Sequence, residues 1–264
     1  MGRVFEVKWF YSGLAAATTA AGVFSWVRYL QRRRILWRER LNNAIPINSL
    51  WWKEYQKRDG ELLYVAIGDS AAQGIGASKP GRSYVGELAR HITRETGKTV
   101  RVVNLGVSGS TVRGAYIDQL PKLRKMNPDV VTVSIGANNM VDFDSERFEN
   151  DLDRLLEGLP PHAIVADLPS FYFLPAEKYV VAANVIVHKL AAKYGFPIVP
   201  LYSRTRRQGL WGVTTQFAGD LFHPNDRGYK IWASAFIPAL TASLRERQRS
   251  GEDAGAAEAA DAAE

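Results

Sequence analysis

Three side chains of this sequence have the types and spacing of a nucleophile and its base. Asp220 and His223 lie three residues apart in the segment DLFHPN, so one turn can bring the carboxylate against the imidazole. A carboxylate that accepts a hydrogen bond from one ring nitrogen leaves the other nitrogen to take a proton from a serine hydroxyl. Ser70, in YVAIGDSAAQGIGA, ends an apolar run and precedes a glycine-rich loop. We interpret Ser70 as a nucleophile for acyl transfer; its position also fits a turn or a phosphate-binding loop.

Acyl transfer also needs hydrogen-bond donors at the point where negative charge develops on the substrate oxygen. Gly109 lies in the segment GVSGS, where a backbone N–H can approach a substrate closely. Asn138 lies in GANN, and its side-chain amide can donate. With the N–H of Ser70, these two residues form a candidate oxyanion hole. Each is an ordinary turn residue when taken alone, so the prediction depends on their occurring together.

Two alternatives concern the same loops and the other histidines. Residues 76–83, GASKPGRS, nearly match a P-loop, with Arg82 in the place of the lysine. A P-loop begins directly at the end of a strand, whereas several residues intervene here, so nucleotide binding is kept as the lesser alternative. His91 and His188 lie in helical patterns and His162 begins a predicted strand, so we expect no catalytic pairing from them.

Short apolar runs rich in β-branched residues must position these loops. Such runs, bounded by Gly, Pro or Asn, are typical of strands buried on both faces of a parallel sheet. Helical patterns separate them, for example at 83–97 and 145–159, and a last helix is predicted from about 225 to 247. The alternation predicts a doubly wound α/β domain, whose chemistry collects beyond the carboxyl ends of its strands. The predicted strands are residues 62–67, 100–105, 129–135, 163–168 and 197–202.

The blocks GDS, NLGVSGST, GANN and DLFHPNDRGYKIWA, in this order, resemble the motifs of the SGNH hydrolases, also called GDSL esterases or lipases. The resemblance covers roughly residues 61–245. It implies a flavodoxin-like three-layer α/β/α sandwich with a central five-stranded parallel sheet. It also implies a Ser70–His223–Asp220 triad and an oxyanion hole formed by Ser70, Gly109 and Asn138.

The activity that the resemblance implies is hydrolysis of carboxylic esters without a metal or a cofactor. Two positions depart from the family pattern: Ala71 stands where leucine is usual, and Asn139 stands where aspartate is more usual. The substrate class stays open between acyl lipids or lysophospholipids, thioesters and carbohydrate acetates. A non-catalytic membrane adaptor on a hydrolase scaffold is the alternative from another class. Candidate pocket or headgroup residues are Phe171, Tyr172, Phe173, Trp211, Arg204, Arg206 and Arg207.

The N-terminal segment predicts a membrane anchor. Residues 9–27, WFYSGLAAATTAAGVFSWV, carry no charge and are just long enough to span a bilayer as a helix. We predict a transmembrane or anchor segment over 1–30 and a basic amphipathic juxtamembrane linker over 31–58. Six arginines follow the apolar run within residues 28–40, so the positive-inside rule places the catalytic domain on the cytoplasmic side. The apolar side chains expected to lie in the membrane interface are those of Leu30, Ile35, Leu36, Trp37 and Leu41.

Composition limits the kinds of site and partner that the chain can have. The 264 residues carry a net charge of +7 and no cysteine, which excludes disulfides, thiolate metal sites and a cysteine nucleophile. Much of the positive charge lies beside the apolar segment, which favours a membrane surface over nucleic acid as the partner. The hydrolase domain is predicted over 59–248, and the acidic, alanine-rich residues 249–264 are predicted to form a disordered tail. Composition makes no prediction of an oligomeric state.

Overall fold

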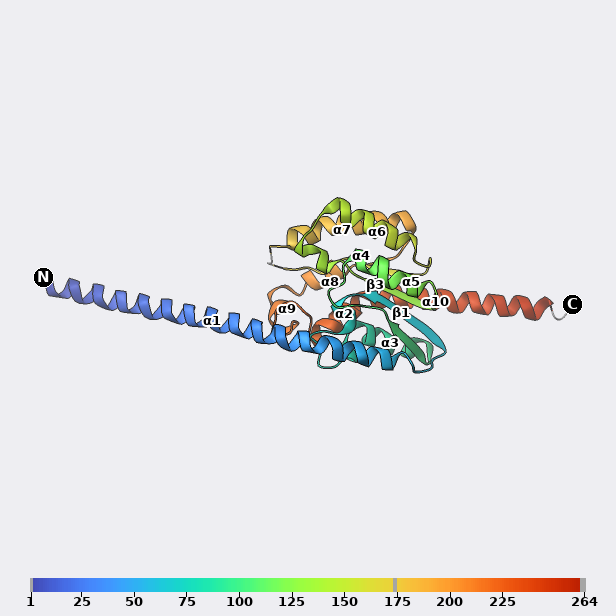
Figure 1. The fold of residues 1–264 in the computed structure, drawn as a ribbon, viewed down its shortest axis with the longest axis horizontal. Coiled ribbons are helices and arrows are strands. Elements are labelled where there is room, and N and C mark those ends of the chain that lie inside the picture. Colours follow the sequence, from blue (N-terminus) through green and yellow to red (C-terminus); the bar gives the residue numbers. More distant parts are fainter. Residues whose placement is uncertain (1, 173–174, 262–264) are drawn as a thin grey trace.

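A single parallel sheet organises the protein (Figure 1). The structure, a computed structural model, describes residues 2–172 and 175–261, with side-chain positions for most of residues 24–249. Its five strands are hydrogen-bonded in the order β2-β1-β3-β4-β5, which is the flavodoxin-like arrangement. The strands are β1 (Leu62–Gly68), β2 (Val100–Asn104), β3 (Val130–Ser134), β4 (Ile164–Ala166) and β5 (Ile198–Val199).

The central strands are apolar because both of their faces are covered. All five residues of β3 are buried, and in β1 only Leu63 is partly exposed. All pairs in the sheet are parallel, with Tyr64 of β1 beside Val102 of β2 on one side and Val130 of β3 on the other. The predicted parallel sheet of five strands is therefore confirmed, and strand order reverses beside β1, where ligand sites of such sheets are found.

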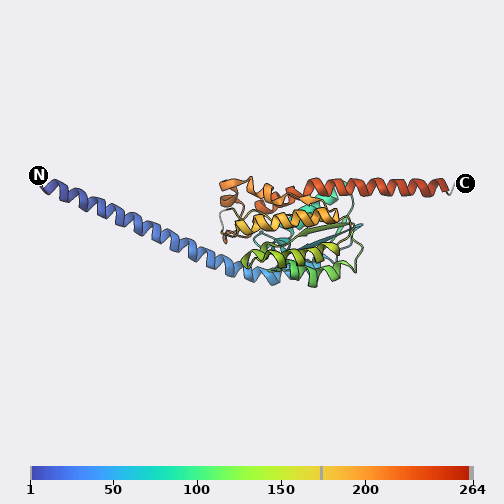
Figure 2. The same ribbon diagram turned by 90° about the horizontal axis from the view of Figure 1, so that it is seen from above.

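Helices form a layer on each face of the sheet (Figures 1 and 2). One core packs valines of the central strands against α4 (Val112–Gly114), η2 (Ala115–Gln119), α5 (Leu120–Leu123), α6 (Ser145–Glu157) and α7 (Glu177–Tyr194). The other packs the opposite face against α1 (Gly2–Tyr55), α3 (Tyr84–Thr96) and α10 (Asp226–Asp261). The remaining short helices are α2 (Ser70–Gln73), η1 (Pro80–Arg82), η3 (Ala137–Val141), α8 (Leu201–Arg206) and α9 (Gly209–Thr215).

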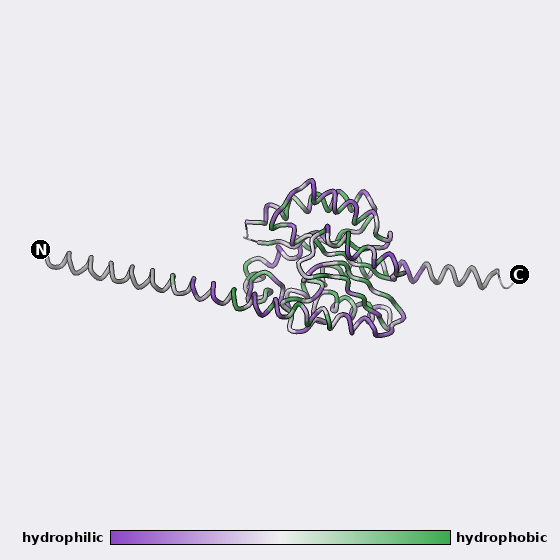
Figure 3. The backbone as a smooth tube through the Cα atoms, viewed as in Figure 1, coloured by the Kyte–Doolittle hydropathy of each residue, from purple (hydrophilic) through white to green (hydrophobic). Residues whose placement is uncertain are grey.

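Helices α3 and α6 begin at the residues that the sequence pattern marks. The Ser83 side chain accepts a hydrogen bond from the Gly86 N–H, and the Asp144 side chain accepts one from the Arg147 N–H. Each helix buries one apolar stripe, and hydrophobic and hydrophilic residues alternate along α6 and α7 in Figure 3. Gly97 ends α3 in the left-handed conformation, with a φ of 70°.

The C-terminal part of α1 packs against the α/β domain, although a linker was predicted over 31–58. Asn48 and Trp52 both donate side-chain hydrogen bonds to the carbonyl oxygen of Gln73, at distances of 3.0 and 3.2 Å. Leu41 is buried against Ile75 and Ala218. Trp37 packs beside them and Leu41 is only 7% exposed, so neither side chain is free to dip into a membrane as predicted. The apolar residues of this segment find their partner in the domain itself.

The predicted transmembrane helix is not supported. In the part of the chain that the structure describes, no helix combines the length and the apolar character needed to cross a membrane. The apolar run at 9–27 is rich in alanine, threonine, serine and glycine, which contribute little hydropathy. The side chains of residues 9–23 lie outside the described residues. The cytoplasmic placement of the domain depended on that span and stays a prediction.

The C-terminal stretch is helical where a disordered tail was predicted. Helix α10 begins at Asp226, as expected, but its backbone continues through Asp261. Alanine has the highest helix propensity of all residues, and alanine is the commonest residue of the stretch GEDAGAAEAADAAE. A stretch without large apolar residues has little to pack against the domain, but it can still form a helix. The other predicted segment boundaries stay predictions.

Candidate active site

Ser70 lies at the point where the central strand β1 turns into a short helix. Gly68 is the last residue of β1, and Asp69 caps α2 by accepting a hydrogen bond from the Ala71 N–H at 2.9 Å. Ser70 is the first residue of α2, so its own N–H is one of the donors that a helix leaves unpaired at its N-terminus. The side chain is mostly buried, with 8% of the residue exposed. The fold thus holds this hydroxyl at the carboxyl end of a central strand of the sheet.

Ser70, His223 and Asp220 form one chain of hydrogen bonds. His223 Nδ1 lies 2.7 Å from Asp220 Oδ2, and His223 Nε2 lies 3.0 Å from Ser70 Oγ. A carboxylate can only accept, so Nδ1 carries the proton of the neutral ring. Nε2 is then left to accept from the Ser70 hydroxyl, which is the arrangement that activates a serine for attack. The structure brings together all three predicted residues, although Ser70 and His223 are 153 residues apart in the sequence.

A tight turn aims Asp220 and His223. The Ala218 N–H donates to the His223 carbonyl at 2.8 Å, and the Leu221 N–H donates to the Ala218 carbonyl at 3.0 Å. Leu221 adopts a φ of 58°, a left-handed conformation that a leucine rarely takes, so packing around the turn must hold it there. Gly76 supports the turn from outside, because a Cβ at this position would lie 2.5 Å from the Pro224 carbonyl oxygen. The glycine-rich loop after Ser70 therefore packs against the histidine.

The surroundings of Asp220 keep it ionised. Burial alone would raise the pKa of this carboxyl group, but its contact with His223 opposes that effect. The N–H groups of Phe222 and His223 both donate to Asp220 Oδ1 at 3.1 Å. Together these contacts hold the pKa of Asp220 below its ordinary value. A permanent negative charge therefore faces the imidazole and favours its protonated form during a reaction.

The predicted oxyanion donors flank Ser70 in two neighbouring loops. Asn138 Nδ2 donates to the Ser110 carbonyl oxygen at 2.9 Å, which joins the loop after β3 to the loop after β2. The same nitrogen makes a long contact of 3.4 Å with Asp69 Oδ2, and this second proton is the one available to a substrate. Gly109 has a φ of 82° and open space beside its Cα. A substrate oxygen can approach its backbone closely for that reason.

Two departures from the family motifs have structural roles. Asn139 Oδ1 accepts a hydrogen bond from the Val112 N–H at 3.0 Å, so an amide at this position ties α4 to the loop after β3. Ala71 is buried and lines the cavity beside Ser70. A small side chain there leaves space next to the nucleophile that a leucine would fill.

Asp69 has a perturbed environment that the sequence did not reveal. Burial raises the pKa of its carboxyl group to about 6, against the partial compensation of the Ala71 N–H and of His223. The folded protein therefore retains this proton up to about pH 6, while an unfolded chain releases it near the ordinary value of 3.8. Because the folded state binds more protons in this interval, the free energy of unfolding falls as the pH rises from about 4 to about 6.

Asp69→Asn is expected to remove this pH dependence. An amide keeps an oxygen for the Ala71 N–H but has no charge to desolvate. Relative to the wild type, the variant should gain about 2 to 3 kcal/mol of unfolding free energy between about pH 4 and about pH 7. Urea unfolding of both proteins at the two pH values measures this difference. An equal pH dependence in both proteins would show that Asp69 titrates normally in the fold.

The hydroxyl of Ser70 opens into an apolar cavity of about 200 Å³. The cavity lies between the turn of His223 and the loop that follows β4. Its walls are mostly hydrocarbon, and the polar groups converge at one end, at Ser70, His223 and Asn138. Of the predicted pocket residues, Phe171 and Tyr172 line the cavity, Trp211 lies outside it, and Phe173 lies outside the described residues. Further walls come from Val213, Phe217, Leu221, Phe222 and Trp232.

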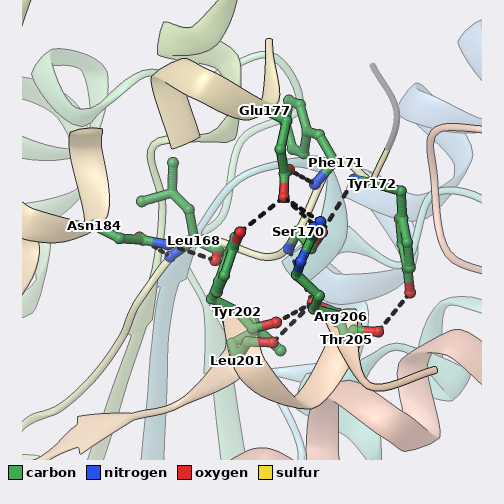
Figure 4. A network of polar contacts seen from close by, with 10 residues as sticks. All are labelled: Leu168, Ser170, Phe171, Tyr172, Glu177, Asn184, Leu201, Tyr202, Thr205 and Arg206. Atoms are coloured by element: carbon green, nitrogen blue, oxygen red, sulfur yellow. Dashed lines mark hydrogen bonds and ion pairs between the residues drawn. The ribbon is translucent and has the colours of Figure 1, made fainter. Parts of the chain in front are cut away.

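One carboxylate holds the wall that Phe171 and Tyr172 form (Figure 4). Glu177 accepts from the Phe171 N–H at 2.6 Å, from the Ser170 hydroxyl at 3.0 Å and from the Tyr202 hydroxyl at 2.9 Å. Arg206 Nη1 also donates to Glu177 at 2.9 Å, so Arg206 helps to hold this wall of the cavity in place. The sequence had offered Arg206 only as a headgroup ligand or a solvated residue. Glu177 itself was missed, because its partners come from two segments, the loop after β4 and helix α8, and α8 is distant from it in the sequence.

Two other sequence interpretations change with the structure. His188 does have a carboxylate partner, since its Nε2 lies 3.1 Å from Asp167 Oδ2. The pair is 21 residues apart and could not be read from spacing. In the segment considered as a P-loop, the N–H and hydroxyl of Ser78 both donate to the carboxylate of Asp226 at 2.7 Å. An acidic partner there opposes phosphate binding. Among the described residues, no group of three or more His, Asp or Glu is placed to hold a metal ion.

Comparisons with known proteins agree with the fold. The sequence model of the GDSL-like Lipase/Acylhydrolase family matches residues 66–231. Similar solved structures include LAE5, an alpha/beta hydrolase from the metagenome of Lake Arreo, Spain, at 24% identity and a TM-score of 0.58 over 71% of this chain and 98% of that chain. TesA is 22% identical, with a TM-score of 0.56 over 69% of this chain and 99% of that chain. No curated protein sequence matches the chain.

A third similar structure is Axe2, an acetylxylan esterase from Geobacillus stearothermophilus. It is 21% identical, with a TM-score of 0.53 over 68% of this chain and 94% of that chain. All three matches span nearly the whole of the other protein but leave about three tenths of this chain uncovered. At these identities the matches show a common fold.

Proposed function

The chain belongs to the GDSL-like lipase/acylhydrolase family, and we propose that it hydrolyses carboxylic esters with Ser70 as the nucleophile. The observation that carries the proposal is the continuous chain of hydrogen bonds from Asp220 through His223 to the Ser70 hydroxyl, with distances of 2.7 and 3.0 Å. The hydroxyl of Ser70, at the end of this series of hydrogen bonds, faces a cavity and is therefore accessible to a small molecule.

In the proposed acylation step, Ser70 Oγ attacks the ester carbonyl carbon while His223 Nε2 takes the hydroxyl proton. The imidazolium that forms is stabilised by the ionised carboxylate of Asp220. His223 then gives its proton to the leaving alcohol, which departs and leaves an acyl ester on Ser70. A water molecule repeats the sequence: His223 takes its proton, the acid is released, and the Ser70 hydroxyl is regenerated.

The negative charge of the tetrahedral intermediate needs donors, and we assign this role to the N–H groups of Ser70 and Gly109 and to the side-chain amide of Asn138. Ser70 and Asn138 both line the cavity, and Gly109 precedes Ser110, whose carbonyl oxygen accepts a hydrogen bond from Asn138 Nδ2. Asn138 can exchange its long contact with Asp69 for the oxyanion while it keeps the hydrogen bond to Ser110. Because the fold holds these donors in place, they stabilise the developing charge at the cost of only the long contact between Asn138 and Asp69.

The cavity favours an acyl group over a sugar as the part of the substrate that enters the protein. Its walls are aromatic and aliphatic, with Phe171, Phe217 and Phe222 among them, and offer few polar groups beyond those proposed for the reaction. A volume of about 200 Å³ fits a short or medium acyl chain. A lysophospholipid or a thioester fits the same description. A non-catalytic adaptor is less favoured, because it would not need Ser70 hydrogen-bonded to His223 at the cavity.

The experiment that tests the proposal compares p-nitrophenyl acetate, butyrate and octanoate as substrates of the full chain. We expect hydrolysis of all three, with the highest kcat/KM for a chain that fills the cavity, and loss of activity after treatment with a fluorophosphonate. Mass spectrometry should locate the phosphonyl group on Ser70. The proposal fails if no ester is hydrolysed above background and no fluorophosphonate is incorporated, an outcome that would favour the adaptor.

A further inference from the structure

Large apolar side chains are exposed on the side of the domain where the cavity opens. On α9, Leu210 and Trp211 are 71% and 70% exposed. Leu221 and Phe222, in the turn that holds His223, are also exposed at the cavity mouth, and Val107 and Val141 follow β2 and β3 at the same edge of the sheet. We call Val107, Val141, Leu210, Trp211, Leu221 and Phe222 the apolar rim. Leu221 and Phe222 also line the cavity, and a concentration of exposed apolar side chains beside a cavity is typical of a binding surface.

Helix α1 leaves the domain on this same side. A groove runs between α9 and α1, lined by Thr214 and Thr215 of α9 and by residues of α1 from Leu36 to Asn48. Figures 1 and 2 show the N-terminal part of α1 projecting past α9, while the end of α10 projects from the opposite side of the domain. The apolar rim and the free part of α1 can therefore meet one extended surface together.

The part of α1 that projects from the domain carries both basic and large apolar side chains between residues 24 and 40. Arg28, Arg32 and Arg38 are exposed, and Phe24, Ile35 and Leu36 are exposed between and beside them. Figure 3 shows this alternation of hydrophobic and hydrophilic residues along the coloured part of the helix. Residues 28–40 contain six arginines and one glutamate. Such a helix, with cationic and large apolar side chains, is suited to the interface of a membrane that carries negative charge.

We propose that the apolar rim and the basic part of α1 together bind an anionic lipid surface, with the mouth of the cavity facing that surface. The arginines contact lipid phosphates, and Leu210 and Trp211 insert among the upper acyl chains. No membrane-spanning segment is required. Resting on the proposed ester hydrolysis, this orientation makes a lipid ester the natural class of substrate, because an acyl chain would pass directly from the lipid layer into the cavity.

The test measures vesicle binding separately from catalysis. The full chain carrying Ser70→Ala is sedimented with phosphatidylglycerol vesicles and with phosphatidylcholine vesicles, so that no lipid is consumed. We expect binding to phosphatidylglycerol that weakens as salt is added, and much weaker binding to phosphatidylcholine. In that background, Leu210→Ser with Trp211→Ser should weaken binding at least tenfold. Replacing Arg28, Arg32 and Arg38 by glutamine should weaken it about fivefold for each arginine removed.

The matched control is Val185→Ser on α7, which is 67% exposed and lies in the helical layer away from α1 and α9. It should leave vesicle binding unchanged. Absence of binding to phosphatidylglycerol would overturn the proposal, as would an equal effect of Val185→Ser or no effect of the α9 pair. Hydrolysis of p-nitrophenyl acetate, measured with Ser70 intact, should be the same in all these variants. A chain that binds vesicles but hydrolyses no ester would refute the proposed activity and leave the lipid surface standing.

Discussion

Replacing Ser70 by alanine is expected to lower kcat for p-nitrophenyl ester hydrolysis by about four to six powers of ten. The variant keeps the cavity, the oxyanion donors and the His223–Asp220 pair, but it has no oxygen that can become acylated. His223 Nε2 loses the partner that lies 3.0 Å away in the wild type, so the imidazole can at best activate water. The measurement compares steady-state hydrolysis of the acetate and butyrate esters by the two proteins. Both are used at the same protein concentration, determined by a method that does not depend on the active site.

Ser108→Ala is the matched control for this substitution. Ser108 is a serine close to the site, in GVSGS, and its buried hydroxyl has no hydrogen-bond partner among the described residues. Removing that hydroxyl should change kcat less than about tenfold, since it breaks no hydrogen bond. Near-normal turnover in Ser70→Ala, together with a large loss in Ser108→Ala, would exclude Ser70 as the nucleophile.

The fold was predictable because the strands are short apolar runs with clear boundaries. The run at 129–135 contains β3, and the run at 62–67 differs from β1 by one residue. The weakest agreement is at β5, which is only Ile198–Val199 where six residues were expected. Apolar composition marks where the chain is buried, but the length of a strand at the sheet edge depends on how far its single neighbour pairs with it.

The core of the site was predictable because its parts are local. Asp220 and His223 share one turn, and Ser70, Gly109 and Asn138 each follow a strand that ends at the same edge of the sheet. Residues that act through distant partners were missed. Gln119 is an example: its side chain exchanges two hydrogen bonds with the backbone of Gly68, next to the nucleophile, from 51 positions away. No spacing rule within the chain indicates such a pair.

Aromatic residues were the least predictable part. Trp37 and Trp52 were expected at a membrane or in a linker, yet both contact the domain, Trp52 through a hydrogen bond to the end of the nucleophile helix α2. Trp211 was expected in the pocket and is exposed instead. Burial of an aromatic ring is decided by the tertiary surface available to it, which the residues next to it in the sequence do not reveal.

Replacing Asp220 by asparagine is expected to lower kcat by about four powers of ten, although the two side chains have nearly the same shape. The backbone N–H groups of Phe222 and His223 both donate to Asp220 Oδ1, so the amide oxygen of the variant must occupy that place. The amide nitrogen then faces His223 Nδ1, which can only accept from it. The neutral ring is forced to carry its proton on Nε2, where it can no longer accept the proton of Ser70.

Asp226→Asn provides the comparison, because it makes the same chemical change six residues away, where the carboxylate only accepts from Ser78. That variant should keep kcat within about threefold, since solvent-exposed hydrogen bonds contribute little. A loss below about tenfold in Asp220→Asn would mean that the imidazole does not depend on this carboxylate for its tautomer. The contrast between the two variants therefore separates the orienting role of Asp220 from any general effect of removing negative charge in the segment before α10.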